Sequence, residues 1–350
     1  MDFFKDSKIL VVGGAGFVGS NLTLKLLEQS PREIIIVDNL LSADASNVPQ
    51  AEQVKFRYGS ITDDRILFDL PEDLDYVFHL ACYHGNQSSI ADPLADHDNN
   101  SYTSLKLFNR LAQMPKIKKV VYAAAGCAVA EKTFGTAHAT AEDQPVSLFH
   151  DSPYSISKLI GELYGNYYLL RYKMPFVRAR FQNIYGPREI LGAGRWRGTV
   201  HTVWRNVTPT FIWRALHHEA LPLDNGGNAS RDFIFVEDIA RGLMACAQHG
   251  KPGEAYNLAS GVETSIRVLA ETINELTGNP TPCDLKPARD WDRSGKRFGS
   301  TEKSEREIGF KAQVSLRDGL KRTIDWTLAN RDVIERCMKQ HEALLKKAMS

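Results

Sequence analysis

The chain has 350 residues, of which 43% are hydrophobic and 24% charged, and its formal net charge is +1. This length suits one large or two closely packed domains, and the balanced charge gives no bulk field that would attract nucleic acid or an anionic membrane. No apolar run approaches the roughly 18 residues of a spanning helix, and the five scattered cysteines contain no C-x-x-C pair. These features predict a cytoplasmic globular protein with reduced thiols and no metal site.

Apolar runs alternate with amphipathic stretches through the first half of the chain. We predict strands at 8–12, 33–37, 54–58, 75–80, 118–123 and 174–181. Helices are predicted at 17–29, 100–113 and 153–171. Such alternation is typical of a parallel sheet with helices on both faces.

The first predicted strand leads into a glycine-rich turn. Gly13, Gly16 and Gly19 follow residues 8–12, and helical periodicity begins at Asn21. A glycine motif alone is often a plain tight turn, but this one stands between a strand and a helix. That context is the one that dinucleotide binding requires, because glycines let the backbone approach a pyrophosphate at a helix N-terminus.

The second apolar run ends in an acid, Asp38, about 20 residues beyond the glycine turn. A carboxylate at this place accepts hydrogen bonds from the adenosine ribose hydroxyls and repels a 2′-phosphate. The pattern therefore favours NAD(H) over NADP(H), although the cation Arg57 weakens the distinction.

Tyr154 and Lys158 lie four residues apart in a predicted helix and so share one face. A phenol alone titrates near ~10, and a neighbouring ammonium lowers that pKa. The pair is a candidate proton-transfer device, although many surface helices carry the same spacing without function.

The pattern loosens after residue 182, where glycines and Arg188, Arg195 and Arg197 form a loop-rich region. Residues 233–238 and 255–258 are predicted as later strands that return to the main sheet. Further helices are predicted at 264–277, 315–329 and 332–349, the last as a charged amphipathic helix for packing or oligomer contact.

The glycine turn, Asp38, the Tyr154-x-x-x-Lys158 pair and the stretch 231–238 together resemble the extended short-chain dehydrogenase/reductases. Within that family the chain is similar to NAD-dependent nucleotide-sugar epimerases and dehydratases, including UDP-galactose 4-epimerase-like enzymes. The resemblance covers residues 7–330. It also includes the stretches 77–81, 98–100, 181–187 and 257–261.

The resemblance implies an α/β fold with a doubly wound parallel (Rossmann) sheet, a smaller α/β substrate-binding domain and a site in the cleft between them. The NAD-binding domain would comprise residues 1–181 and 233–261. The nucleotide-sugar-binding domain would comprise 182–232 and 262–330, and 331–350 would form a C-terminal helix.

By the same resemblance, Tyr154 would be the catalytic base and Lys158 would tune it and hold the nicotinamide ribose. Ser60 stands where relatives often carry an Asp that touches the adenine. The full set of implied cofactor contacts is Gly13, Gly16, Phe17, Val18, Asp38, Asn39, Ser60, Ile61, Leu80, Ala81, Asn99, Tyr154 and Lys158.

The implied substrate contacts lie in both halves of the chain. Asn183 would contact the sugar diphosphate, and Arg231 and Arg293 would clamp its phosphates. His84 follows the strand that ends at Ala81, near the nicotinamide half of the cofactor, although a loop histidine is more often solvated.

The chain departs from the family where a Ser or Thr usually helps to pass the proton to the tyrosine, because this position is Ala125. The next two positions, which hold carboxylates in 4,6-dehydratases, are Gly126 and Cys127. Without those acids, simple 4-epimerisation is favoured over elimination or decarboxylation.

The expected activity is thus 4-epimerisation of a UDP-hexose derivative, N-acetylated or a uronic acid, for surface polysaccharide synthesis. Because of Cys127, a 3,5-epimerase is an alternative activity, in which His201, His217 or His218 would be the partner of the thiol. A net dehydrogenase and a non-catalytic dinucleotide-binding relative are further alternatives. The resemblance also implies a homodimer that pairs through the helices at 100–113 and 153–171.

Overall fold

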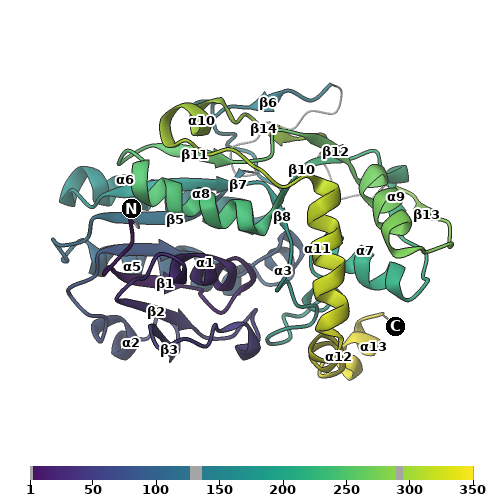
Figure 1. The fold of residues 1–350 in the computed structure, drawn as a ribbon, viewed down its shortest axis with the longest axis horizontal. Helices are drawn as coiled ribbons and strands as arrows, with labels where there is room; N and C mark the ends of the chain where they lie inside the picture. Colours follow the sequence, from purple (N-terminus) through teal and green to yellow (C-terminus); the bar gives the residue numbers. More distant parts are fainter. Residues whose placement is uncertain (1–2, 127–135, 289–294, 350) are drawn as a thin grey trace.

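The computed structural model describes residues 3–126, 136–288 and 295–349, so Cys127 and Arg293 of the predicted site lie outside the described residues. Its central layer is a seven-stranded parallel sheet with the order β11-β7-β5-β4-β1-β2-β3 (Figure 1). These strands are β1 (Lys8–Val12), β2 (Glu33–Asp38), β3 (Val54–Tyr58), β4 (Tyr76–His79), β5 (Lys119–Ala125), β7 (Phe176–Phe181) and β11 (Ala255–Leu258).

Helices cover both faces of this sheet, because consecutive side chains of its central strands are apolar and point to opposite faces. Ile9 and Val11 of β1 belong to one buried cluster, and Leu10 and Val12 belong to the cluster on the other face. The first cluster includes α1 (Phe17–Leu27), α8 (Val236–His249) and α10 (Glu302–Ile308), and the second includes α2 (Asp64–Phe68), α5 (Thr103–Leu111) and α6 (Pro153–Tyr172). The predicted doubly wound sheet is confirmed.

A smaller α/β unit lies at the carboxyl-end side of the sheet (Figure 1). Its sheets are β12 (Glu263–Ser265), β10 (Ser230–Phe235) and β8 (Asn183–Tyr185), and the pair β13 (Asp284–Lys286) and β9 (Pro222–Asp224). One apolar cluster joins them to α7 (Val207–Leu216), α9 (Ile266–Thr277) and α11 (Leu316–Ala329). A short pair, β6 (Ala139–Thr140) and β14 (Phe298–Gly299), completes the strands of the described chain.

Two predicted elements are wrong in part. The strand predicted at 233–238 ends at Phe235 and pairs with β8 and β12 instead of the main sheet, because the following residues begin α8 with two acids in its first turn. The helix predicted at 100–113 is preceded by α3 (Asn86–Ala91), α4 (Pro93–Asp96) and a π-helical turn (His97–Tyr102), and α5 itself begins at Thr103.

The C-terminal helix predicted at 332–349 is also wrong in part, because it is two helices, α12 (Arg331–Lys339) and α13 (Glu342–Met349). At the break, the side chains of Gln340 and His341 both bond to the carbonyl of Gly192, at 2.8 and 3.0 Å. In α12, Arg336 pairs with Asp44 at 3.0 Å. The C-terminal helices therefore join the loop after β2 to the loop that contains Gly192.

None of the described helices is long and apolar enough to span a membrane. The longest, α6, instead packs closely on the main sheet through two glycines. A Cβ added at Gly161 would overlap the ring of Tyr122, and one added at Gly165 would overlap the ring of Phe176. This close approach places the first turn of α6 beside the end of β5.

We predict that Gly165→Leu lowers the free energy of unfolding by about 1–3 kcal/mol or more, because Phe176 is fully buried and has no space to move into. Urea unfolding would measure the change. The matched control is Ala329→Leu at an exposed position of α11, for which a change within about 0.5 kcal/mol is expected. Equal midpoints for the two variants would contradict the prediction.

Candidate active site

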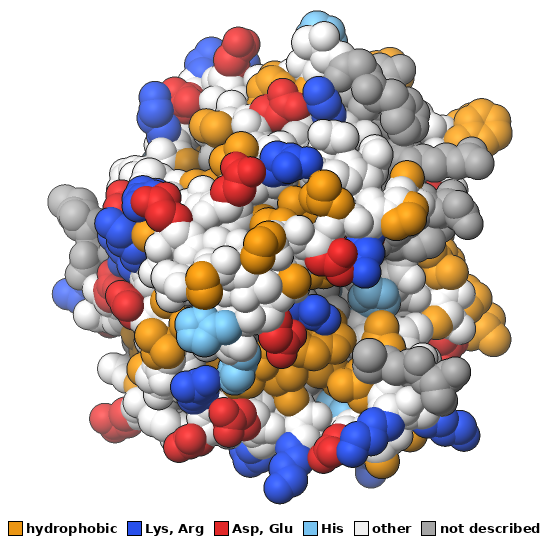
Figure 2. Space-filling view, turned by 90° about the vertical axis from the view of Figure 1, so that its right-hand side faces the viewer, with side chains coloured by type: hydrophobic (Ala, Val, Ile, Leu, Met, Phe, Trp, Pro, Cys, Tyr) orange, Lys and Arg blue, Asp and Glu red, His pale blue; other side chains and the backbone are white. Residues whose placement is uncertain are grey.

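A cavity of about 720 Å³ opens at the carboxyl ends of the central strands and extends to the first turn of α7 and to β10. Val12, Leu80, Ala125 and Phe181 line it at or just beyond the ends of four neighbouring strands of the main sheet. In a parallel sheet this edge is where ligands bind. On the face turned toward the viewer in Figure 2, acidic and basic side chains are interspersed.

The glycine turn forms the first wall of the cavity. Gly13 has a φ of +85°, and a Cβ there would lie 2.5 Å from the backbone nitrogen of Ala81. Gly16 caps α1 without a side-chain hydrogen bond and lines the cavity, which leaves N–H groups of the first helical turn for an anion. This wall fits a dinucleotide pyrophosphate, because only bare backbone can approach so closely.

Asp38 supports the same wall at the end of β2. Its carboxylate accepts hydrogen bonds from the backbone N–H groups of Ala15 at 3.1 Å and Leu40 at 2.8 Å. Burial raises the pKa of Asp38, and these backbone hydrogen bonds partly offset that effect. The acid therefore lies on the cavity beside the glycine turn, as ribose recognition requires.

The other predicted cofactor residues of the described chain line the same cavity. They are Phe17, Val18, Asn39, Ser60, Ile61, Leu80, Ala81 and Asn99, together with Tyr154 and Lys158. The hydroxyl of Ser60 lies 2.8 Å from that of Thr62 and accepts a hydrogen bond from its N–H, so a local turn holds it. Which of these side chains contact the cofactor stays a prediction.

The start of α6 positions Tyr154 and Lys158. Ser152 caps the helix by accepting a hydrogen bond from the N–H of Ser155. Lys158 is 3% exposed, and its Nζ donates to the carbonyl of Ala123 in β5 at 2.8 Å. The ammonium is thus fixed beneath the cavity, on the same helix face as the phenol.

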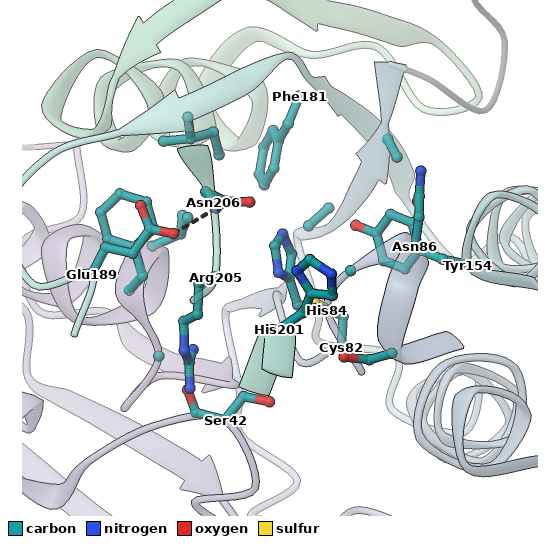
Figure 3. Close-up of a pocket in the computed structure, with 18 of the residues that line it drawn as sticks. Ser42, Cys82, His84, Asn86, Tyr154, Phe181, Glu189, His201, Arg205 and Asn206 are labelled. Carbon is teal, nitrogen blue, oxygen red and sulfur yellow. Dashed lines mark hydrogen bonds between the residues drawn. The ribbon is translucent and has the colours of Figure 1, made fainter. Parts of the chain in front are cut away.

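The residues opposite Tyr154 include two histidines. Figure 3 shows the phenol of Tyr154 pointing into the cavity toward the rings of His84 and His201. The rings of His84 and Tyr154 meet edge to face with centroids 6.0 Å apart. Burial, then the charges of Arg197, Arg205 and Lys158, lower the pKa of His84 to about 3, so its imidazole is neutral. His84 is half-buried at the site, not a solvated loop residue.

The predicted substrate residues of the described chain also line the cavity, namely Ala125, Asn183 and Arg231. Arg231 donates from Nη1 to the carbonyl of Gly295 at 2.8 Å. Nearby, Asn206 caps α7 without a side-chain hydrogen bond to the helix, and Val207 of the first turn lines the cavity. This second helix N-terminus, with Arg231, is suited to a second diphosphate.

Sequence reasoning missed the wall formed by Glu189, Arg205 and Asn206, which lies across the cavity from Tyr154 (Figure 3). Glu189 is 6% exposed, accepts a hydrogen bond from Asn206 at 2.5 Å, and leaves its second oxygen without a partner. Burial raises its pKa to about 7, with Arg205 opposing the shift. A polar residue in an irregular segment gives no periodic signal, so only the fold reveals its burial.

Arg188, Arg195 and Arg197, in the loop that also carries Glu189, have different surroundings in the structure. Arg197 lines the cavity, whereas the exposed Arg195 donates to the hydroxyl of Tyr58 and Arg188 donates to the carbonyl of Asn47. Only Arg197 of the three can therefore contact a ligand in this cavity.

The doubly wound sheet, the glycine turn with its acid, and Tyr154 one helical turn before the buried Lys158 are features of an NAD-dependent epimerase or dehydratase. The chain belongs to the NAD dependent epimerase/dehydratase family, whose model matches residues 9–259. Its cofactor is NAD, in agreement with the fit of the glycine wall.

Three relatives illustrate the likeness. The Bordetella bronchiseptica enzyme WbmF, solved in complex with NAD⁺ and UDP, is 56% identical with a TM-score of 0.89, over 99% of each chain. UDP-N-acetylglucosamine 4-epimerase from Methanobrevibacter ruminantium M1, in complex with UDP-N-acetylmuramic acid, is 27% identical with a TM-score of 0.82, over 93% of this chain and 99% of that one. A putative UDP-glucose 4-epimerase from Methanocaldococcus jannaschii is 30% identical over 92% of this chain and 99% of its own.

The raised pKa of Glu189 predicts a pH-dependent stability. In the unfolded chain its carboxyl would ionise near 4.5, but in the folded protein near 7, so the folded state holds a proton that the unfolded state has lost. The contribution of Glu189 to the free energy of unfolding should thus fall as pH rises between these values, by at most about 3 kcal/mol.

Urea unfolding of the wild type, Glu189→Gln and the exposed control Glu52→Gln, at about pH 5 and about pH 8, measures this contribution. The Glu189→Gln variant should gain stability relative to the wild type at the higher pH, and the control should not. An unchanged difference between wild type and Glu189→Gln at the two pH values would show that the carboxyl ionises normally.

Proposed function

We propose that the protein is an NAD-dependent nucleotide-sugar 4-epimerase that acts on a UDP-linked hexose, N-acetylated or a uronic acid, through a transient 4-keto sugar. One observation carries the proposal. Tyr154 and the buried Lys158 meet the cavity at the end of β5, where Ala123 and Ala125 present methyl groups and Gly126 presents no carboxylate. A base without a neighbouring acid on this strand suits reversible oxidation better than elimination of water.

The roles of the residues follow from their chemistry. Lys158 favours the ionised phenol of Tyr154, which removes the proton from the 4-hydroxyl of the sugar and later returns it. When bound, NAD accepts a hydride from carbon 4 and gives it back. The 4-keto sugar would turn within the cavity between these events, so that the hydride returns to the opposite face of carbon 4.

The nucleotide half would be held by the N-terminus of α7, Asn183 and Arg231, which together offer N–H groups and a guanidinium to a diphosphate. Uridine as the base is supported by WbmF, whose structure was solved with NAD⁺ and UDP. We further propose a role in surface polysaccharide synthesis, on the sole ground that a nucleotide sugar of this kind is a sugar donor.

A second candidate is a 3,5-epimerase that uses Cys127. The observation that favours it is His201, which lines the cavity and could act as the partner base, whereas His217 and His218 are exposed and do not line it. A non-catalytic dinucleotide-binding relative is the third candidate, because Ala125 lacks a hydroxyl.

The test is incubation of the NAD-loaded protein with UDP- and GDP-sugars, including uronic and N-acetylated forms, in deuterated water. NMR should show inversion at carbon 4 without deuterium on any ring carbon. Tyr154→Phe should lower the rate by about 10²-fold or more while leaving bound NAD unchanged. Deuterium at carbon 3 or 5 would instead select the Cys127 mechanism, and full activity of Tyr154→Phe would remove the proposed base.

We also propose a homodimer that pairs through α5 and α6. The exposed side of α6 carries large apolar side chains, Leu163, Tyr167 and Leu170, which are 59%, 51% and 74% exposed. They follow one another at helical spacing and so form a continuous apolar stripe that a second copy would cover.

Light scattering should give twice the chain mass for the wild type, and the double variant Leu163→Glu/Leu170→Glu should be monomeric because two carboxylates would be buried in the pairing surface. Leu328→Glu, at a 48% exposed position of α11, is the matched control and should stay dimeric. A monomeric wild type, or a dimeric double variant, would refute pairing through α6.

A further inference from the structure

One buried arginine of the described chain has no carboxylate partner. Three arginines there are at most 9% exposed, Arg110, Arg180 and Arg197. Arg180 pairs with Glu162 at 2.8 Å and Arg110 reaches Glu72 at 3.5 Å, but no described acid pairs with Arg197. A buried cation without a counter-ion is costly, so its presence indicates that something else supplies the negative charge.

Neutral contacts fix the position of Arg197 without compensating its charge. Its Nη1 donates to the carbonyl of His84 at 2.8 Å, its backbone N–H donates to the hydroxyl of Thr202 at 3.0 Å, and its guanidinium lies 5.5 Å from the ring centroid of Tyr83. Nε is buried without a partner, and Nη2 makes no hydrogen bond to a described residue. The side chain is therefore preorganised toward the cavity that it lines.

A second arginine adds to the positive charge of this wall. Arg205 donates from Nη1 to the carbonyl of Ser42 at 2.8 Å and from Nη2 to that of Ala193, and it too has no ion pair with a described acid. Burial, and then the charge of Arg197, lower its pKa to about 10, so it is still a cation at neutral pH.

The neighbouring titratable groups do not neutralise these two cations. Glu189 has a pKa of about 7 and gives one oxygen to Asn206, so it is only partly ionised at neutral pH. His84, whose pKa is about 3, adds no charge. The wall consequently keeps a net positive charge that a bound ligand can match.

The diphosphates of the two ligands already have places elsewhere in the cavity. The glycine turn and the start of α1 are suited to the cofactor, and the start of α7 with Arg231 is suited to the nucleotide sugar. Arg197 instead bonds to the backbone of His84, whose ring meets that of Tyr154. It is thus next to the place where Tyr154 would meet the sugar 4-hydroxyl.

We propose that Arg197, with Arg205 beside it, forms a subsite for a carboxylate on the hexose, so that the preferred substrate is a nucleotide-linked uronic acid. A carbon-6 carboxylate is attached to carbon 5, the neighbour of the carbon at which Tyr154 would act, and so would be close to the place where His84 and Arg197 lie beside Tyr154. A neutral hydroxymethyl or acetamido group leaves the guanidinium charge uncompensated. This inference rests on the proposed function for the placement of carbon 4.

The test is calorimetric binding of UDP-glucuronate, UDP-glucose and UDP to the NAD-loaded protein, which needs no turnover and so stands apart from the epimerase assay. The wild type should bind UDP-glucuronate at least about tenfold more tightly than UDP-glucose, as expected for a charge-assisted hydrogen bond. Arg197→Gln should abolish that ratio and leave the affinities for UDP-glucose and UDP within about twofold. Arg197→Lys should keep part of the preference for UDP-glucuronate over UDP-glucose, because the positive charge remains.

Arg195→Gln is the matched control, because this exposed arginine lies in the same loop outside the cavity, and it should behave as the wild type. Equal affinity of the wild type for the two UDP-sugars would overturn the proposal, as would a ratio that survives in Arg197→Gln. Loss of NAD from Arg197→Gln, with the carboxylate preference retained, would assign the arginine to the cofactor diphosphate instead. Carboxylate-selective binding without inversion at carbon 4 would uphold the subsite and refute the 4-epimerase.

Discussion

The arrangement of the site depends on one close contact between two strand ends. Gly13 leaves β1 with its α-carbon so near the backbone of Ala81, beyond β4, that no side chain fits between them. The glycine turn, Asp38 at the end of β2 and the loop that leads to His84 share the carboxyl edge of the parallel sheet, and this contact brings the glycine turn against the start of that loop. The glycine turn and the loop that carries His84 are therefore parts of one continuous wall of the cavity.

A second constraint positions the chemistry on that edge. The glycines of α6 allow the helix to pack directly on Tyr122 and Phe176, and Lys158 reaches the carbonyl of Ala123 as a result. The amino group of Lys158 thereby satisfies part of its hydrogen-bonding capacity on the strand, and it lies on the same face of α6 as Tyr154. A bulkier helix surface would move Tyr154 and Lys158 away from the end of β5, so the packing of α6 and the position of this pair depend on the same two glycines, Gly161 and Gly165.

The sequence predicted those features that local pattern determines. The glycine turn, the acid of β2 and the Tyr154–Lys158 spacing each follow from a few adjacent residues, and all of them line the cavity. The sequence pattern did not predict which strands β10 pairs with, because the apolar run before α8 can pair with either sheet and only tertiary packing selects β8 and β12. Glu189 was not predicted either, and the sequence did not distinguish Arg197 from Arg188 and Arg195, since a charged residue in an irregular loop has the same appearance whether it is solvated or buried.

The break between α12 and α13 has a consequence for how the cavity is completed. The loop that carries Glu189 and Arg197 passes Gly192, whose added Cβ would lie 2.5 Å from the carbonyl oxygen of Cys337, and Gln340 and His341 hold that loop by its carbonyl. The loop that carries Glu189 and Arg197 is thus supported by a residue that lies 148 positions beyond Gly192 in the chain. During synthesis on the ribosome, the main sheet and the helices that cover it are complete once α10 has emerged, but this loop gains its support only after His341 has emerged.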